Sequence, residues 1–149
     1  VVDCGSSDGT VALAQRLGWI AEGRFGEQDI GWTGRLAVPQ TLAELERHVA
    51  GALRRTPLTI GDADRRVERV AWCSGGGQGY FEQAAALGVD AFLSGEISEH
   101  TVHLARESGV AYLSAGHHAS ERLGVQALAG HLSATFGLAC EFVDIDNPV

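Results

Sequence analysis

The sequence predicts an α/β protein with a mixed, mainly parallel sheet flanked by helices. From residue 67 onward, apolar runs of strand length alternate with helical patterns, and most runs are followed by a polar, glycine-rich turn. Glycine accounts for 20 of the 149 residues, which favours many tight connections. Apolar residues make up 45% of the chain and charged residues 20%, a composition typical of globular domains. Strands alternating with helices are typical of parallel strands joined by crossover helices.

The first half of the chain predicts two helices and a pair of strands. A helix is expected over 10–17 and ends at Gly18. Two strands joined by a polar turn are expected within 19–38, where aromatic and β-branched residues mix with glycine. Thr41 and Glu44 have the spacing of a capping box, which predicts the start of the second helix.

The second half predicts four strands, the first three of which are each followed by a helix. These helices are expected to end at Gly88, Gly109 and Gly137, because glycine readily adopts the left-handed conformation that terminates a helix. The expected strands cover residues 67–73, 89–93, 110–113 and 138–145.

The polar turns after the first three of these strands are the expected place for chemistry. They are Ser74–Gly77, Ser94–Glu96 and Ser114–His118. If the strands are parallel, the turns lie at one rim of the sheet. Ligands of open α/β sheets gather beyond the carboxyl ends of the strands. The pattern therefore predicts that the three turns open toward a common region.

Charge and hydropathy exclude several classes of partner. The formal net charge is −8, from 11 Lys and Arg against 19 Asp and Glu. Such a balance disfavours tight non-specific binding to nucleic acid or an anionic membrane. No window approaches the roughly 18 uninterrupted apolar residues of a membrane helix, and no basic segment followed by an apolar run opens the chain. The expected location is the cytoplasm.

Two further features concern the start of the chain and its cysteines. The chain contains no Met and opens on Val1-Val2-Asp3, which is typical of a strand already under way and predicts missing upstream sequence. Cys4, Cys73 and Cys140 are odd in number and lack CxxC spacing. They are interpreted as buried free thiols in a reducing compartment rather than as a disulfide or a zinc site.

The strongest local signal for a metal is the pair His117 and Glu121. Residues four apart at the start of a helix share one face, with about 5–6 Å between their Cβ atoms. Neutral imidazole and carboxylate are common ligands of Zn, Mn, Fe and Ni. A solvated histidine beside a surface glutamate is the alternative that spacing alone leaves open.

Glu96 and His118 are the residues expected to assist chemistry. Glu96 follows Gly95 at a strand end, where its carboxylate could orient a metal-bound histidine or transfer protons. A glutamate that only complements a helix dipole is the alternative. His118 points about 100° away from His117 around a helix, so it is either a neighbouring partner or simple polarity at the helix start.

The glycine run Gly75–Gly77 allows a further hypothesis. Its backbone N–H groups could cradle a phosphate at the start of a helix. It matches neither a Walker A motif nor a GxGxxG fingerprint, and a tight turn after a strand explains it equally well.

Taken together, these motifs resemble a known family. The segments at 70–78, 89–99, 115–122 and 144–148 are similar, in this order, to motifs of the NGG-interacting-factor-three-like family. Its members are often labelled GTP cyclohydrolase I type 2 homologue or dinuclear metal-centre hexameric protein. The resemblance is strong over residues 67–149 and extends back to about residue 18.

The resemblance implies a two-lobed α/β fold, a ring-shaped homohexamer and two divalent metal ions per subunit (Zn, Mn, Fe or Ni). In the family a His-Glu pair separated by three residues supplies metal ligands, and it matches His117 and Glu121. A family Asp ligand has Asp3 as its nearest counterpart, although the sequence around Asp3 departs from the family pattern. An adjacent His-His pair from an earlier strand of the family has no counterpart in this chain.

The resemblance also divides the chain and suggests a function. Residues 1–22 would be the remnant of a first lobe, 23–114 a second α/β lobe, and 115–149 a helix and strand that carry metal ligands back to the first lobe. The leading hypothesis is a metal-dependent hydrolase of a nucleotide-like or phosphoester substrate, with Glu96 and His118 as catalytic residues. The alternative is a non-catalytic hexameric module that binds metal or a partner, and a third is a metal-free nucleotide-binding domain.

Overall fold

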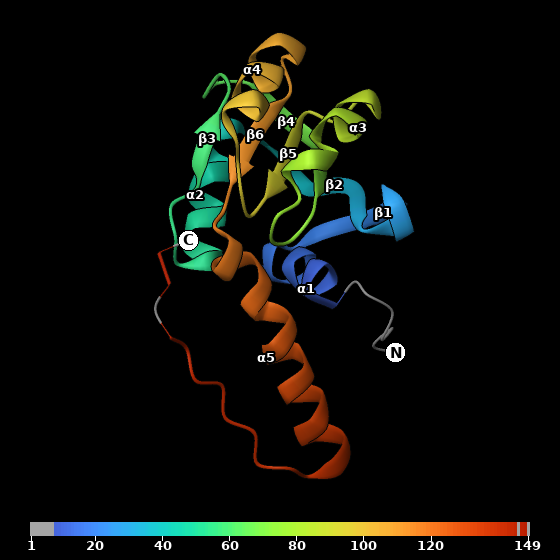
Figure 1. Ribbon diagram of the computed structural model, residues 1–149, viewed down its shortest axis with the longest axis vertical. Coiled ribbons are helices and arrows are strands. Elements are labelled where there is room, and N and C mark those ends of the chain that lie inside the picture. The colour runs from blue at the N-terminus through green and yellow to red at the C-terminus, as the bar shows by residue number, and fades with distance from the viewer. Residues whose placement is uncertain (1–7, 146, 149) are drawn as a thin grey trace.

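The computed structural model describes residues 8–145, 147 and 148, which form one six-stranded sheet with helices on both faces (Figure 1). The strands are β1 (Trp19–Phe25), β2 (Gly31–Thr41), β3 (Leu58–Ile60), β4 (Arg66–Trp72), β5 (Ala91–Ser94) and β6 (Ala111–Ser114). The α-helices are α1 (Asp8–Leu17), α2 (Leu42–Leu53), α3 (Phe81–Ala86), α4 (Glu99–Ser108) and α5 (His117–Phe136). Two short 3₁₀ turns complete the set, η1 (Glu27–Asp29) and η2 (Gln78–Tyr80).

The sheet confirms the predicted mixed α/β class, but its parallel part is smaller than expected. The strand order is β1-β2-β4-β5-β6-β3. Only β4, β5 and β6 run parallel, whereas β1–β2, β2–β4 and β3–β6 are antiparallel. The expectation of a mainly parallel sheet is therefore corrected. The difference arises from the β1–β2 hairpin and from β3, a strand of three residues that gives no periodic signal of its own.

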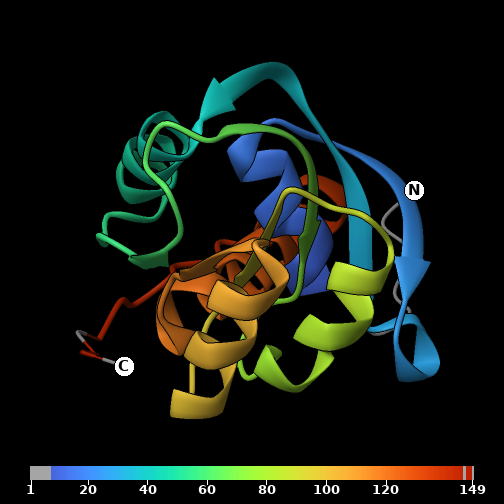
Figure 2. The same cartoon turned by 90° about the horizontal axis from the view of Figure 1, so that it is seen from above.

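Two apolar layers hold the helices against the sheet because alternate residues of a strand face opposite sides. One core packs α1 and α2 against Val70, Trp72 and Leu93. The other packs α3 and α4 against Phe92 and Tyr112. Figure 2 shows α3 and α4 on the same side of the strands, away from α2. The carboxyl ends of β4, β5 and β6 lead into turns that pack against the start of α5.

The predicted helix ends are confirmed where a local chemical signal exists. The Thr41 side chain accepts a hydrogen bond from the Glu44 backbone N–H, and the Glu44 carboxylate accepts one from the Thr41 backbone N–H. Gly109 and Gly137 end α4 and α5 in the left-handed conformation. The capping box and the terminal glycines depend only on residues a few positions apart, so they can be recognised in the sequence without knowledge of the fold.

The predicted strand over 138–145 is wrong. This segment is extended but has no strand pairing, and it runs back alongside α5 toward the end of α2 (Figure 1). Its apolar residues Leu138, Val143 and Ile145 are exposed, as are Val125 and Leu128 on α5. The apolar pattern predicted a strand, but none of the described strands pairs with this segment.

The described residues also bear on the expectations for the cysteines and for membrane helices. Cys73 is buried as predicted, whereas Cys140 is exposed, which corrects the expectation for that thiol; Cys4 lies outside the described residues. None of the described helices is long and apolar enough to cross a membrane. The division at residues 22 and 114 stays a prediction.

The capping box generates a test of the fold. Thr41→Ala removes the side-chain acceptor at the start of α2 and should lower the free energy of unfolding by about 1 kcal/mol. Chemical denaturation of the variant and the wild type measures this difference. Thr59→Ser, at a position remote from any helix start, serves as the matched control, and equal destabilisation in both variants would contradict the capping role.

Candidate metal-binding site

Backbone hydrogen bonds join the three polar turns at the rim of the sheet. The Gly95 N–H donates to the Gly75 carbonyl at 2.8 Å, and the Gly116 N–H donates to the Gly95 carbonyl at 2.9 Å. The turns after β4, β5 and β6 are therefore held side by side, as the parallel register of these strands requires. The prediction of a common rim is confirmed.

The glycine run after β4 is occupied by internal hydrogen bonds. The Gly75 N–H donates to Ser120 Oγ at 2.9 Å, and the Gly77 N–H donates to Ser94 Oγ at 3.0 Å. Ser94 Oγ in turn donates to the Gly75 carbonyl. Because two of the three glycine N–H groups already have protein acceptors, this turn is poorly suited to cradle a phosphate. The metal-free nucleotide hypothesis loses its main support.

Gly75 also allows the turn to lie directly against the candidate metal ligands. Its φ is +60°, a conformation that residues with a side chain rarely adopt. A Cβ at this position would overlap Glu121 Oε1 and would lie 3.1 Å from His117 Nε2. The glycine thus brings the backbone of one turn against the side chains of α5.

A chain of four side chains crosses the rim. Gln78 Nε2 donates to Glu96 Oε2 at 3.1 Å, and Glu96 Oε1 lies 2.6 Å from His117 Nδ1. The other ring nitrogen, His117 Nε2, lies 3.0 Å from Glu121 Oε2. His117 and Glu96 are each 39% exposed, so the chain lies at the surface rather than in the core. Glu96, His117 and Glu121 are brought together as the sequence predicted.

The two carboxylates change the protonation of His117. The pKa of the His117 imidazole is raised, chiefly by the hydrogen bond with Glu96 and further by the negative charge of Glu121. The pKa of Glu96 is lowered, first by its hydrogen bond with His117 and then by that with Gln78. Behind the rim, burial raises the pKa of the Cys73 thiol to about 12, because the thiolate is poorly solvated there.

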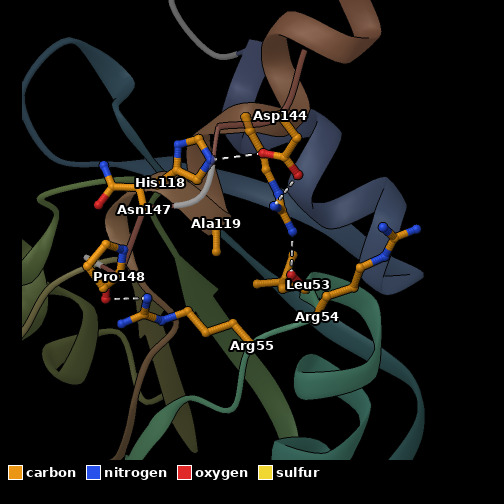
Figure 3. Close-up of a pocket in the computed structure, with 9 residues that line it drawn as sticks. Leu53, Arg54, Arg55, His118, Ala119, Asp144, Asn147 and Pro148 are labelled. Atoms are coloured by element: carbon orange, nitrogen blue, oxygen red, sulfur yellow. Dashed lines mark hydrogen bonds and ion pairs between the residues drawn. The ribbon is translucent and has the colours of Figure 1, made fainter. Parts of the chain in front are cut away.

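His118 faces a different side of α5. Its Nε2 lies 3.1 Å from Asp144 Oδ1, and Asp144 Oδ2 accepts a hydrogen bond from Arg122 at 2.8 Å (Figure 3). As predicted, His118 points about 100° away from His117 around the helix, and there it contacts the C-terminal tail at Asp144. The structure does not bring His118 into the chain of side chains that links Glu96, His117 and Glu121.

The described residues do not form a cluster of metal ligands by themselves. Within residues 8–145, 147 and 148, no group of three or more His, Cys, Asp or Glu side chains is arranged to hold a metal ion. His117 Nε2 and Glu121 provide a pair of adjacent donors, and Glu96 occupies the other ring nitrogen. Asp3, the third predicted ligand, lies outside the described residues.

Comparison with known proteins identifies the family. A model described as Duf34/NIF3 (NGG1p interacting factor 3) matches residues 3–148. The chain belongs to this family. A protein of Allochromatium vinosum named GTP cyclohydrolase 1 type 2 homolog is 62% identical over 117 residues, covering 78% of this chain and 46% of the relative. A Neisseria meningitidis protein of the same name is 51% identical over 136 residues, covering 91% and 55%.

Solved structures of Duf34/NIF3 relatives share the fold. A structure described as protein ybgI, of unknown function, superimposes with a TM-score of 0.90 at 42% identity and covers 95% of this chain and 57% of its own. A Thermus thermophilus protein gives a TM-score of 0.78 at 30% identity, covering 92% and 54%. The chain therefore spans about half the length of the relatives it matches.

Sequence reasoning missed several residues that shape the site. Gln78 orients Glu96, Ser120 holds the Gly75 turn, and Asp144 pairs with two residues of α5. Gln78 and Asp144 both fall within the motifs that carry the family resemblance. That placement was the available signal, but a motif does not state which side chain its polar residues contact.

The link between Glu96 and His117 can be tested without metal. Glu96→Gln removes the carboxylate that favours the imidazolium, so the pKa of His117 should fall toward the ordinary value of about 6.5. The charged form would then be lost at a lower pH. NMR titration of the histidine ring signals with a chelator present measures this shift.

Glu99→Gln is the matched control, because Glu99 is an exposed carboxylate at the start of α4. It should leave the His117 titration in place. An unchanged His117 pKa in Glu96→Gln would contradict the contact.

Proposed function

We propose that this Duf34/NIF3 protein is a metal-dependent hydrolase of a nucleotide-like or phosphoester substrate, and that this chain supplies His117 and Glu121 to a dinuclear metal centre. The observation that carries the proposal is the pairing of His117 Nε2 with Glu121 at 3.0 Å while Glu96 occupies Nδ1. The names of the curated relatives, GTP cyclohydrolase 1 type 2 homolog, support a hydrolytic class.

The contacts of His117 assign a role to each ring nitrogen. With Nδ1–H donating to Glu96, Nε2 faces Glu121 and the space beside Gly75, and it becomes free to bind metal when it gives up the proton that it shares with Glu121. A ligating histidine usually donates its second ring N–H to a carboxylate, which fixes the tautomer and the ring orientation. This support favours His117 Nε2 as the metal-binding atom.

Glu96 acts in this proposal as a positioning residue. Both of its carboxylate oxygens are engaged, one by His117 Nδ1 and one by the Gln78 amide. A carboxylate whose oxygens are both hydrogen-bonded, and whose pKa is lowered by those bonds, is a poor proton donor at neutral pH. From the sequence, Glu96 was expected to transfer protons. We propose instead that it accepts the hydrogen bond of His117 Nδ1–H and so keeps the proton on that nitrogen.

His117 and Glu121 supply two of the ligands that a divalent ion needs. Imidazole nitrogen and carboxylate oxygen suit Zn, Mn, Fe and Ni, and a dinuclear centre needs further ligands from outside the described residues, with Asp3 as one of them. When bound, two such ions would supply Lewis acidity and an activated water for hydrolysis. His118 and the basic residues near it would contact the substrate rather than the metal.

The proposal includes assembly. A ring-shaped homohexamer in the cytoplasm, acting on a small molecule, is the state that the family resemblance implies. Exposed apolar residues on α5, Val125, Leu128 and Phe136, are consistent with a covered face in the complete assembly.

Replacement of the two neighbouring histidines tests the metal site. His117→Ala in the full-length protein should weaken metal affinity by more than about tenfold, since outer partners of a ligand alone contribute 10-fold or more. His118→Ala should retain metal, because His118 Nε2 faces Asp144. Elemental analysis of both variants beside the wild type, at a pH above the histidine range, measures metal content.

Unchanged metal content in His117→Ala would overturn the site. Hydrolysis of a panel of phosphoesters and nucleotides by the same preparations tests the activity. Full metal content in the wild type with no turnover of any substrate would contradict the hydrolase and favour the non-catalytic module.

A further inference from the structure

A hollow of about 510 Å³ lies between the end of α2, the start of α5 and the C-terminal tail (Figure 3). Its charged lining residues are mainly basic. They are Arg54, Arg55, His118 and Arg122, with Asp144 as the acidic member. In a chain of net charge −8, this concentration of guanidinium groups requires an explanation.

Arg122 is held rigidly in the wall of this hollow. Its side chain is 16% exposed. One guanidinium nitrogen donates to Asp144 Oδ2 at 2.8 Å, and another donates to the Leu53 carbonyl at 2.6 Å. Asp144 also contacts His118 Nε2, so a single carboxylate contacts both His118 and Arg122. A fixed guanidinium loses little entropy when it binds an anion.

Arg55 lies on the opposite wall and reaches the backbone next to His117. A Cβ on Gly116 would lie 2.5 Å from Arg55 Nε, so the Arg55 side chain packs directly against the residue that precedes α5. Its Nη1 donates to the Pro148 carbonyl at 2.6 Å. A neighbouring hollow is lined by both Arg55 and Glu96. Arg55 therefore stands between the basic hollow and the metal-binding rim.

The start of α5 carries two side-chain pairs with different chemistry. His117 and Glu121 form one pair four residues apart, and His118 and Arg122 form the next, about 100° further round the helix. The first pair presents the proposed metal ligands, whereas the second presents an imidazole and a guanidinium group. His118, Glu121 and Arg122 also line a shared surface depression. A ligand bound by His118 and Arg122 would therefore lie next to His117 and Glu121, on the adjacent face of α5.

We propose that the hollow binds the phosphate group of a phosphomonoester substrate, with Arg55 and His118 contacting the phosphate and Arg122 fixing the wall. Guanidinium groups recognise phosphate through paired, charge-assisted hydrogen bonds. The inference rests on the proposed hydrolase, for which it names the substrate class. It explains why His118 stands apart from the metal ligands although it adjoins them in sequence.

Binding measurements on the full-length protein, with a chelator present to remove metal, test the site. Calorimetric titrations would use inorganic phosphate, a nucleoside 5′-monophosphate and the unphosphorylated nucleoside. The monophosphate should bind more tightly than inorganic phosphate, and the nucleoside should not compete. Arg55→Gln should weaken binding of the monophosphate about tenfold, the value of one hydrogen bond to a charged group. Arg47→Gln, on the exposed face of α2, should leave it unchanged.

A second measurement needs no substitution. The NMR signal of the Arg55 Nε–H in the wild type should shift as phosphate is added. Equal affinity in Arg55→Gln and Arg47→Gln together with an unmoved Arg55 signal would overturn the inference, as would binding of the nucleoside as tight as that of its monophosphate.

The same experiment separates this inference from the metal site. His117→Ala should bind the monophosphate as the wild type does, because His117 is outside the hollow. Loss of metal in that variant without any phosphate binding to the wild type would defeat the inference alone. Phosphate binding with metal content unaffected in His117→Ala would defeat the proposed metal centre alone.

Discussion

The pair of backbone hydrogen bonds from Gly116 to Gly95 and from Gly95 to Gly75 is the constraint on which the site depends. These bonds extend the parallel register of β4, β5 and β6 beyond the last strand residues. They fix the start of α5 against the other two turns, and so place His117 beside Glu96 although 21 residues separate them in sequence. The side-chain chemistry at the rim follows from this backbone arrangement.

The same constraint gives α5 two adjacent faces with different side-chain chemistry. One face carries His117 and Glu121 into the chain of hydrogen bonds from Gln78 and Glu96. The next carries His118 and Arg122 toward the C-terminal tail. Because the spacing of both pairs is one helical turn, a single helix start can present a His–Glu pair and a His–Arg pair together. In the proposed function these pairs hold the metal and the substrate phosphate, respectively.

Sequence reasoning succeeded where the signal is local and failed where it depends on a distant partner. The capping box of Thr41 and Glu44, the glycines after α4 and α5, and the helical spacing of His117 and Glu121 are all expressed within a few residues. The contact of Gln78 with Glu96 depends on sheet register, so no local pattern contains it. The apolar residues over 138–145 indicated a buried face but not its partner, and the strand predicted there is absent. Asp144 consequently emerged as a partner of α5 only from the three-dimensional arrangement.

We propose that His117 binds metal through Nε2 while Glu96 holds Nδ1. Anomalous diffraction from crystals of the metal-loaded, full-length protein, recorded on both sides of the absorption edge of the metal, would locate the ion. We expect an anomalous peak about 2.0–2.2 Å from His117 Nε2 and a similar distance from a Glu121 carboxylate oxygen, with the Glu96 contact at Nδ1 retained. A peak bonded to Nδ1, or a metal bound only by residues other than His117 and Glu121, would contradict it.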